Sequence, residues 1–180
     1  MKTIGRLITV LVLFSVPAFS QGKDFTIFAG AQFPGKITLS NAPSTGTAGA
    51  TQIISNPKKA GEFGVRFGHG KLFGGEHTVA FSSDFLDGRS KAFIYNSNFR
   101  IQAPLPVVRP YVTAGMGTII SWGSGVSDLG SKFAVNYGGG VKIMPGPVGI
   151  NFGIRGYAVP SVQKQTLYIT EASVGVNFGF

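Results

Sequence analysis

The sequence contains no cysteine, which excludes disulfide bonds, thiolate metal sites and a lipid anchor on an N-terminal cysteine. Charged residues make up only 13% of the 180 residues, and there are just two histidines. Beyond the N-terminal region, no segment approaches the roughly 20 consecutive apolar residues that a transmembrane helix needs. If the chain enters a membrane, it must therefore cross it with β-strands, whose backbone groups are satisfied only in a closed barrel.

Glycine, by contrast, is abundant with 27 residues, and 12% of the chain is aromatic. Low charge and many aromatic residues suit a barrel whose exterior is dissolved in lipid. Abundant glycine suits a barrel interior so narrow that small residues must leave room for large ones.

The N-terminus has the organisation of an export signal. Lys2 and Arg6 precede a short apolar run, and small residues follow shortly before Gln21. A basic start, an apolar run of this length and a small-residue site are typical of a cleaved signal peptide. We predict that residues 1–20 are the signal peptide and that residues 21–180 form the mature chain.

Positive charge exceeds negative charge in the mature chain. Without Lys2 and Arg6, the chain keeps 14 Lys and Arg against 7 Asp and Glu, a net charge of +7. The basic residues are scattered, with only Lys58 and Lys59 adjacent, and the chain is exported, so we predict no nucleic-acid partner. We expect the positive charge to attract outer-membrane lipid head groups and the phosphates of lipopolysaccharide.

The C-terminal segment, residues 168–180, alternates between two kinds of residue. One set is mostly apolar and ends on Phe178 and Phe180, whereas the other is small or polar and includes Glu171 and Asn177. A period of two describes a β-strand whose two faces meet different surroundings. Here the pattern predicts lipid on one side and a polar barrel interior on the other.

Seven further segments alternate in the same way, separated by clusters of Gly, Pro, Asn and Ser. They cover residues 23–33, 61–70, 76–86, 91–102, 110–122, 132–143 and 148–158. A membrane strand uses about 9–11 residues, so eight strands fit the mature chain and twelve would not. We therefore predict an all-β fold, an eight-stranded antiparallel up-and-down transmembrane β-barrel.

Connection lengths predict the orientation of this barrel. Short turns are expected at 71–75, 103–109 and 144–147, and longer or more polar connections at 34–60, 87–90, 123–131 and 159–166. Short periplasmic turns and long external loops are the rule in outer-membrane barrels. We therefore place both termini on the periplasmic side, with a long external loop at 34–60.

The facing of one segment stays open. In the fifth segment, Val112 and Met116 favour one outward face, whereas Tyr111 favours the other. In the third segment, the alternation places Phe85 outward, on the same face as His77.

Three segments carry a resemblance to a known family, residues 108–117, 136–142 and 174–180. The chain resembles the eight-stranded outer-membrane barrels of the OmpA/OmpX type, in the broad outer membrane protein β-barrel domain group. This resemblance implies a place in the outer membrane of a Gram-negative-type bacterium. It also implies that the barrel assembly machinery reads the last strand, with Phe178 and Phe180 as the assembly signal. Because nothing follows Phe180, we expect no appended peptidoglycan-binding domain.

The sequence offers no catalytic or cofactor site. Pairing about the turn at 71–75 sets His69 beside His77 on the lipid face, and two imidazoles without further ligands do not make a zinc site. The glycine clusters at 68–70 and 115–117 precede no helix that could hold a phosphate. We therefore predict no catalytic residues, no metal and no cofactor.

A set of charged side chains falls on the inward faces by parity. The six residues are Glu62, Arg66, Arg100, Lys142, Arg155 and Glu171. Pairing the last two strands sets Arg155 beside Glu171, and charges in so narrow an interior must be paired or hydrated. We expect a structural plug of ion pairs. Four basic against two acidic residues leave a narrow pore with a basic lumen as an alternative.

The function expected from these observations is that of a non-enzymatic, monomeric integral outer-membrane barrel. Its role is structural or one of surface interaction, exerted through the external loops. Two alternatives stay open besides an enzyme acting on outer-membrane lipid: a narrow pore for small solutes, and an adhesin or ligand-capture protein that uses the 34–60 loop.

Overall fold

The computed structural model describes residues 22–37, 39–40, 53–54, 57–88, 90–123 and 128–180. The predicted signal peptide and the middle of the predicted 34–60 loop lie outside these residues. None of the helices in the described part is long and apolar enough to cross a membrane.

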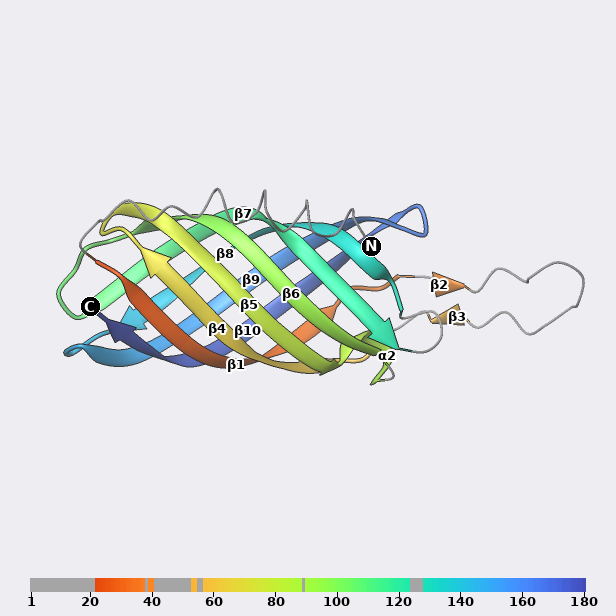
Figure 1. Ribbon diagram of the computed structural model, residues 1–180, viewed down its shortest axis with the longest axis horizontal. Coiled ribbons are helices and arrows are strands. Elements are labelled where there is room, and N and C mark those ends of the chain that lie inside the picture. Colours follow the sequence, from red (N-terminus) through yellow and green to blue (C-terminus); the bar gives the residue numbers. More distant parts are fainter. Residues whose placement is uncertain (1–21, 38, 41–52, 55–56, 89, 124–127) are drawn as a thin grey trace, which may run out of the picture.

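Eight strands form a closed barrel, in which each strand is antiparallel to both neighbours (Figure 1). The strands are β1 (Asp24–Pro34), β4 (Ala60–His69), β5 (Phe73–Asp84), β6 (Ser90–Gln102), β7 (Val108–Gly123), β8 (Gly130–Ile143), β9 (Val148–Val162) and β10 (Gln165–Gly179). The predicted eight-stranded antiparallel barrel is confirmed, and the eight predicted segments correspond to these eight strands.

The first and last strands close the barrel. They pair from Asp24 with Gly179 to Pro34 with Ile169. Just beyond this ladder, the backbone N–H of Lys23 donates to the carbonyl of Phe180, and that of Phe180 donates to the carbonyl of Lys23, both at 2.9 Å. The backbone of the last residue is therefore part of the seam.

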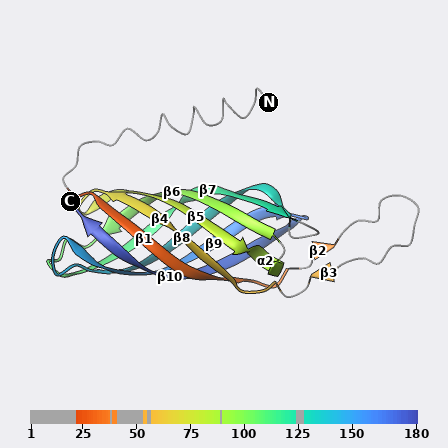
Figure 2. The ribbon, with the colours of Figure 1, turned by 60° about the horizontal axis from the view of Figure 1, so that its bottom comes forward.

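The strands are tilted, and the tilt follows from the register (Figure 2). Starting at Asp24 and moving from each residue to its paired neighbour, the path returns to β1 at Pro34, ten residues further along (34 − 24). It passes through Gly68, Glu76, Asn98, Gly115, Asn136, Tyr157 and Ile169. A stagger of this kind is what closure of a barrel requires. A path that follows the paired residues around the barrel therefore climbs along the barrel axis, and the residues it reaches on opposite walls lie at different heights.

One end of the barrel carries additional structure. The short helix α2 (Phe85–Gly88) follows β5, and a two-residue ladder joins β2 (Leu39–Ser40) to β3 (Ile53–Ile54). Both lie at the end opposite the C-terminus (Figures 1 and 2). We call this the external end and the other the periplasmic end, following the predicted orientation.

Side chains alternate between the outer wall and the interior, which we call the bore. Large apolar side chains face outward with high exposure, for example Phe63 at 62% and Ile154 at 64%. In β7, Val112 and Met116 face outward, whereas Tyr111 is 5% exposed and faces the bore. The structure thereby settles the facing that the sequence left open.

Phe85 departs from the predicted alternation. It was expected to face outward, but its side chain is fully buried. The reason is that the strand ends at Asp84 and the chain turns into α2, so strand parity no longer applies.

Two connections are tighter than predicted. The β4–β5 turn is short and uses Gly70 at φ 91°, so His69 pairs with Gly75 and His77 pairs with Phe67. The predicted pairing of the two histidines is therefore wrong. The β9–β10 hairpin extends to Val162 and Gln165, and Gln163 and Lys164 form its turn with positive φ. Most of the loop predicted at 159–166 is consequently strand.

Candidate functional site: the bore of the barrel

The structure places all six predicted charged residues inside the bore. Each is at most 4% exposed. Two further carboxylates, Asp24 and Glu76, also face the bore, at 8% and 1% exposure. Among the described residues, the bore thus holds four basic and four acidic side chains, so the predicted basic lumen is wrong. The alternation that places Phe25 and His77 outward also places Asp24 and Glu76 inward, so this signal was present in the sequence.

Asp24 joins two basic side chains near the periplasmic end. Its Oδ2 lies 2.7 Å from Arg100 Nη2, and its Oδ1 lies 2.6 Å from Lys142 Nζ. Asn177 adds a donor, because its Nδ2 lies 3.3 Å from Asp24 Oδ1 and 2.6 Å from Thr26 Oγ1. One carboxylate on β1 therefore links β6, β8 and β10.

Arg155 reaches across the bore to β5. Its Nη2 lies 2.5 Å from Glu76 Oε1, and its Nη1 donates to Thr78 Oγ1 at 3.0 Å. Arg155 and Glu171 are register neighbours, as predicted, but the expected ion pair between them does not form. In a barrel this narrow, a long arginine side chain can span the diameter, and β5 is the wall directly opposite β9.

Glu171 instead pairs with Arg66 of β4. Its second oxygen accepts a hydrogen bond from the hydroxyl of Tyr157 at 2.6 Å. Arg66 also donates to Ser173 at 3.0 Å, and its guanidinium lies 3.8 Å from the centre of the Phe28 ring. This pair is therefore surrounded by polar and aromatic contacts, although the buried Nε of Arg66 has no hydrogen-bond partner among the described residues.

Glu62 has a different environment from the other carboxylates. Its Oε2 accepts a hydrogen bond from Gln32 Nε2 at 2.6 Å, whereas its Oε1 has no hydrogen-bond partner among the described residues. Within the part of the chain that the structure describes, no ion pair joins it to a basic side chain.

Glycine makes room for these large side chains. A Cβ atom at Gly117 would lie 2.4 Å from Asn96 Oδ1 and 1.9 Å from the carbonyl oxygen of Tyr95. A Cβ at Gly68 would lie 2.1 Å from Arg100 Nη1. The glycines thus leave space in the bore for long and hydrogen-bonded residues.

The external end of the bore is filled by apolar side chains. Phe85, Leu86 and Leu167 have no exposed surface, and Ile37 and Ile169 are nearly as buried. Leu86 has φ 61°, and its carbonyl accepts a hydrogen bond from the backbone N–H of Lys58 at 2.5 Å. These five residues form the apolar half of the bore. It was not predicted from the sequence, because Phe85 and Leu86 were assigned to a strand with Phe85 facing outward, and Ile37 was assigned to the long 34–60 loop.

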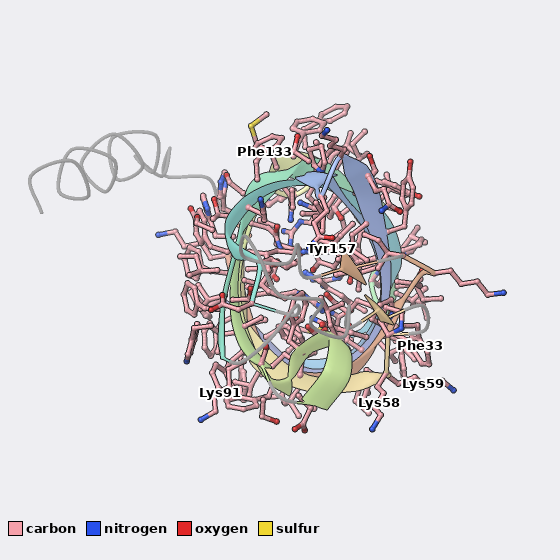
Figure 3. The ribbon with its side chains drawn as sticks, turned by 90° about the vertical axis from the view of Figure 1, so that its right-hand side faces the viewer. Phe33, Lys58, Lys59, Lys91, Phe133 and Tyr157 are labelled. Atoms are coloured by element: carbon pink, nitrogen blue, oxygen red, sulfur yellow. The ribbon has the colours of Figure 1, made fainter. Side chains whose placement is uncertain are left out.

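The ion-paired residues Asp24, Arg66, Glu76, Arg100, Lys142, Arg155 and Glu171 form the ionic half. Below it, the periplasmic mouth opens into a cavity of about 440 Å³ lined by Lys23, Lys71, Arg109 and Asn177, among others. Seen from the external end, Tyr157 lies inside the ring of strands, whereas Phe133 and Lys91 point away from it (Figure 3). Among the described residues, the bore is therefore filled by the ionic and the apolar half, and its periplasmic mouth opens into this cavity.

The two histidines lie outside the bore. His77 stacks on Tyr95 with ring centres 6.3 Å apart, and its Nδ1 lies 3.1 Å from the tyrosine hydroxyl. In the described residues, no group of three or more His, Cys, Asp or Glu side chains is placed to hold a metal ion.

Comparison with known proteins identifies a family and several similar solved structures. The family described as outer membrane protein beta-barrel domain matches residues 7–180. No curated protein matches the chain. Among solved structures, Neisserial surface protein A (NspA) is similar with 13% sequence identity and a TM-score of 0.61, covering 88% of this chain and 97% of its own.

Two other solved structures are similar. OprG from Pseudomonas aeruginosa has 12% identity and a TM-score of 0.57, covering 89% of this chain and 97% of its own. The outer membrane enzyme PagL has 13% identity and a TM-score of 0.51, covering 86% of this chain and 98% of its own. At such identities the likeness concerns the fold alone.

Proposed function

The chain belongs to the outer membrane protein β-barrel domain family and is a barrel of the Gram-negative outer membrane, and we propose that it is a closed, non-enzymatic barrel. Its role is structural or one of surface interaction, exerted at the external end.

The observation that carries this proposal is the filling of the bore. Each of the four basic side chains is buried and ion-paired to a carboxylate. Above them, Phe85, Leu86 and Leu167 have no exposed surface. A passage for solutes would need a continuous hydrated path, and paired charges followed by an apolar plug oppose one. This arrangement disfavours the narrow pore.

Conductance across a planar lipid bilayer tests the closed barrel. Purified, folded protein should give only rare, brief openings under an applied voltage, whereas a porin in the same bilayer gives steady current. Steady current from the wild-type protein would overturn the proposal and favour the pore.

The positions of the histidines support a non-enzymatic role. The His69 and His77 side chains lie on the outer wall near the β4–β5 turn, and His77 is engaged by Tyr95. Neither faces the buried carboxylates, so no nucleophile, base and acid are brought together there. Purified protein should therefore release no fatty acid from lipopolysaccharide, which mass spectrometry of the lipid can measure.

A second candidate is ligand capture by the 34–60 loop. The short β2–β3 ladder, in which Leu39 pairs with Ile54, carries the chain past the end of the barrel (Figure 1). Replacing residues 41–52 with a short Gly-Ser linker should leave the barrel folded. If the loop captures a ligand, intact cells with the replacement should adhere less to glycan-coated surfaces than wild-type cells.

We also infer that residues 1–20 are removed on export, because the N-terminus has the organisation of a signal peptide. The mature protein should begin at Gln21, which the intact mass of protein purified from outer membranes can test. A mass that includes residues 1–20 would contradict this inference.

The role of Phe180 in assembly can be separated from its role in the seam. Its side chain is 69% exposed on the outer wall, whereas its backbone pairs with Lys23. Phe180→Ala keeps the backbone bonds and removes the ring. If the barrel assembly machinery reads the ring, Phe180→Ala should lower outer-membrane yield almost as much as deletion of Phe180. Equal yields of wild type and Phe180→Ala would assign the residue to the seam alone.

A further inference from the structure

Two adjacent lysines stand at the external rim of one wall. Lys58 and Lys59 are exposed, and the ammonium of Lys59 lies 5.3 Å from the centre of the Phe33 ring. Figure 3 shows the three side chains gathered at the same side of the barrel, with Lys91 on another side. The four ion pairs among the described residues all lie in the bore, so none of the described carboxylates forms an ion pair with Lys58 or Lys59.

An apolar groove of about 700 Å³ lies on the outer wall nearby. It crosses β8, β9 and β10, and Gly139, Phe152, Ile154 and Ala172 are among the residues that line it. Phe152 and Ile154 are 49% and 64% exposed on the lipid-facing side, so the groove opens toward lipid. Its depth arises because small residues face outward between large ones.

The register connects the groove to the lysines. Gly139 pairs with Ile154, Ile154 with Ala172, and Ala172 with Ala31 of β1. The row continues from Ala31 to Gly61 of β4, where an added Cβ would meet nothing within 4 Å.

Phe33 is the next outward residue of β1 beyond Ala31, toward the external end. Lys59 stands two positions before Gly61, on the same side of that row. From Ala172 at the edge of the groove, the small side chains of Ala31 and Gly61 therefore lead to a position directly below the Phe33 ring and the Lys59 ammonium.

These features fit a lipid better than a protein partner. The outer wall of a membrane barrel faces hydrocarbon, and only groups without unsatisfied polar atoms are tolerated there. Lysines at a membrane surface attract anionic lipid head groups. A molecule with a phosphate at the rim and acyl chains below it matches both the charge and the groove.

We propose that this wall binds a phosphorylated acyl lipid of the outer leaflet, with its phosphate at Lys58 and Lys59 and an acyl chain that passes along Ala31 and Ala172 into the groove. The site lies outside the barrel and does not depend on whether the bore conducts. A leaky barrel could still bind the lipid, and a closed one could fail to bind it.

Native mass spectrometry of the full mature barrel in detergent micelles can test the charged part of the site. The probes are lipopolysaccharide and the same lipopolysaccharide after removal of its phosphates. One lysine near an anionic surface changes affinity roughly fivefold at low salt. Lys59→Gln should therefore weaken binding of the phosphorylated lipid about fivefold, and Lys58→Gln with Lys59→Gln should weaken it further.

Lys91→Gln is the matched control, since it removes the same charge from the same rim on another side. It should leave the affinity nearly unchanged. Equal losses in Lys59→Gln and Lys91→Gln would mean that the rim attracts lipid by diffuse charge, and the localised site would be wrong.

The groove has its own pair of variants. Ala172→Phe fills it and should reduce binding of both the phosphorylated and the dephosphorylated lipid. Ser97→Phe adds the same ring to an outward position of β6, away from the groove, and should not. Equal lipid binding by these two variants would show that the groove holds no acyl chain. Displacement of the lipid by millimolar inorganic phosphate would show that the lysines bind a phosphate alone. A heat-modifiability gel on every variant verifies that it is folded.

Discussion

The two halves of the bore are equally buried and yet are filled by opposite chemistry. In the ionic half, Arg155 and Glu76 are 3% and 1% exposed, and each is matched to a partner on the opposite wall. In the apolar half, Phe85 and Leu167 are fully buried among other apolar side chains. The same narrow space is therefore closed in two different ways. In one, a lost partner leaves a charge behind, and in the other a lost side chain leaves a cavity.

The largest effect is expected from breaking one ion pair in the ionic half. Glu76→Ala removes the carboxylate of Glu76 and leaves Arg155 buried and unpaired, which costs roughly 3–5 kcal/mol of unfolding free energy. Urea unfolding of the protein in lipid vesicles, followed by a heat-modifiability gel, measures this loss.

The control combines Glu76→Leu with Arg155→Met, which replaces the pair by apolar side chains. This variant should recover most of the stability, since a buried pair contributes little compared with apolar residues of similar size. If the double variant is as unstable as Glu76→Ala, the loss comes from packing rather than from an unpaired charge.

A somewhat smaller effect is expected in the apolar half. Phe85→Ala leaves a cavity under α2 and should cost about 3 kcal/mol, in the range for a buried phenylalanine at a site that can partly collapse. Phe133→Ala is the control, because that ring is 50% exposed on the outer wall. Similar losses in urea for both variants would indicate that Phe85 is not part of a plug.

The third prediction concerns which charges are coupled. The structure pairs Glu171 with Arg66, although Arg155 is its register neighbour. A double-mutant cycle of Glu171→Ala with Arg66→Ala should give a coupling of about 2 kcal/mol, larger than the cycle with Arg155→Ala. A larger coupling with Arg155 would restore the pairing that the register alone suggests.

The smallest effect tests whether the two halves are independent. Glu76 and Phe85 are nine positions apart, roughly 25–30 Å along an extended strand. Losses from Glu76→Ala and Phe85→Ala should therefore add to within about 0.5 kcal/mol in the combined variant. A clear deviation from additivity would show that the ionic and apolar halves support each other as a single unit.

The alternation along the sequence is enough to predict the barrel and the facing of most side chains. Every strand has lipid on one side and the bore on the other, so a period of two is imposed on each of them. The terminal run ending on Phe178 and Phe180, and the inward positions of Arg66 and Glu171, follow from that alternation alone.

Which charges meet, and which side chains close the external end, depend on how the whole barrel folds. Arg155 pairs with Glu76 because closing the barrel brings β9 opposite β5, and the stagger of the strands sets the two residues at the same height. The alternation within a strand predicts that both residues face inward, but not that they lie across from each other. Phe85 is buried because the chain leaves the strand after Asp84 and folds over the bore in α2. Alternation is a local consequence of surroundings on two sides, whereas contacts across the bore depend on closure of the whole barrel.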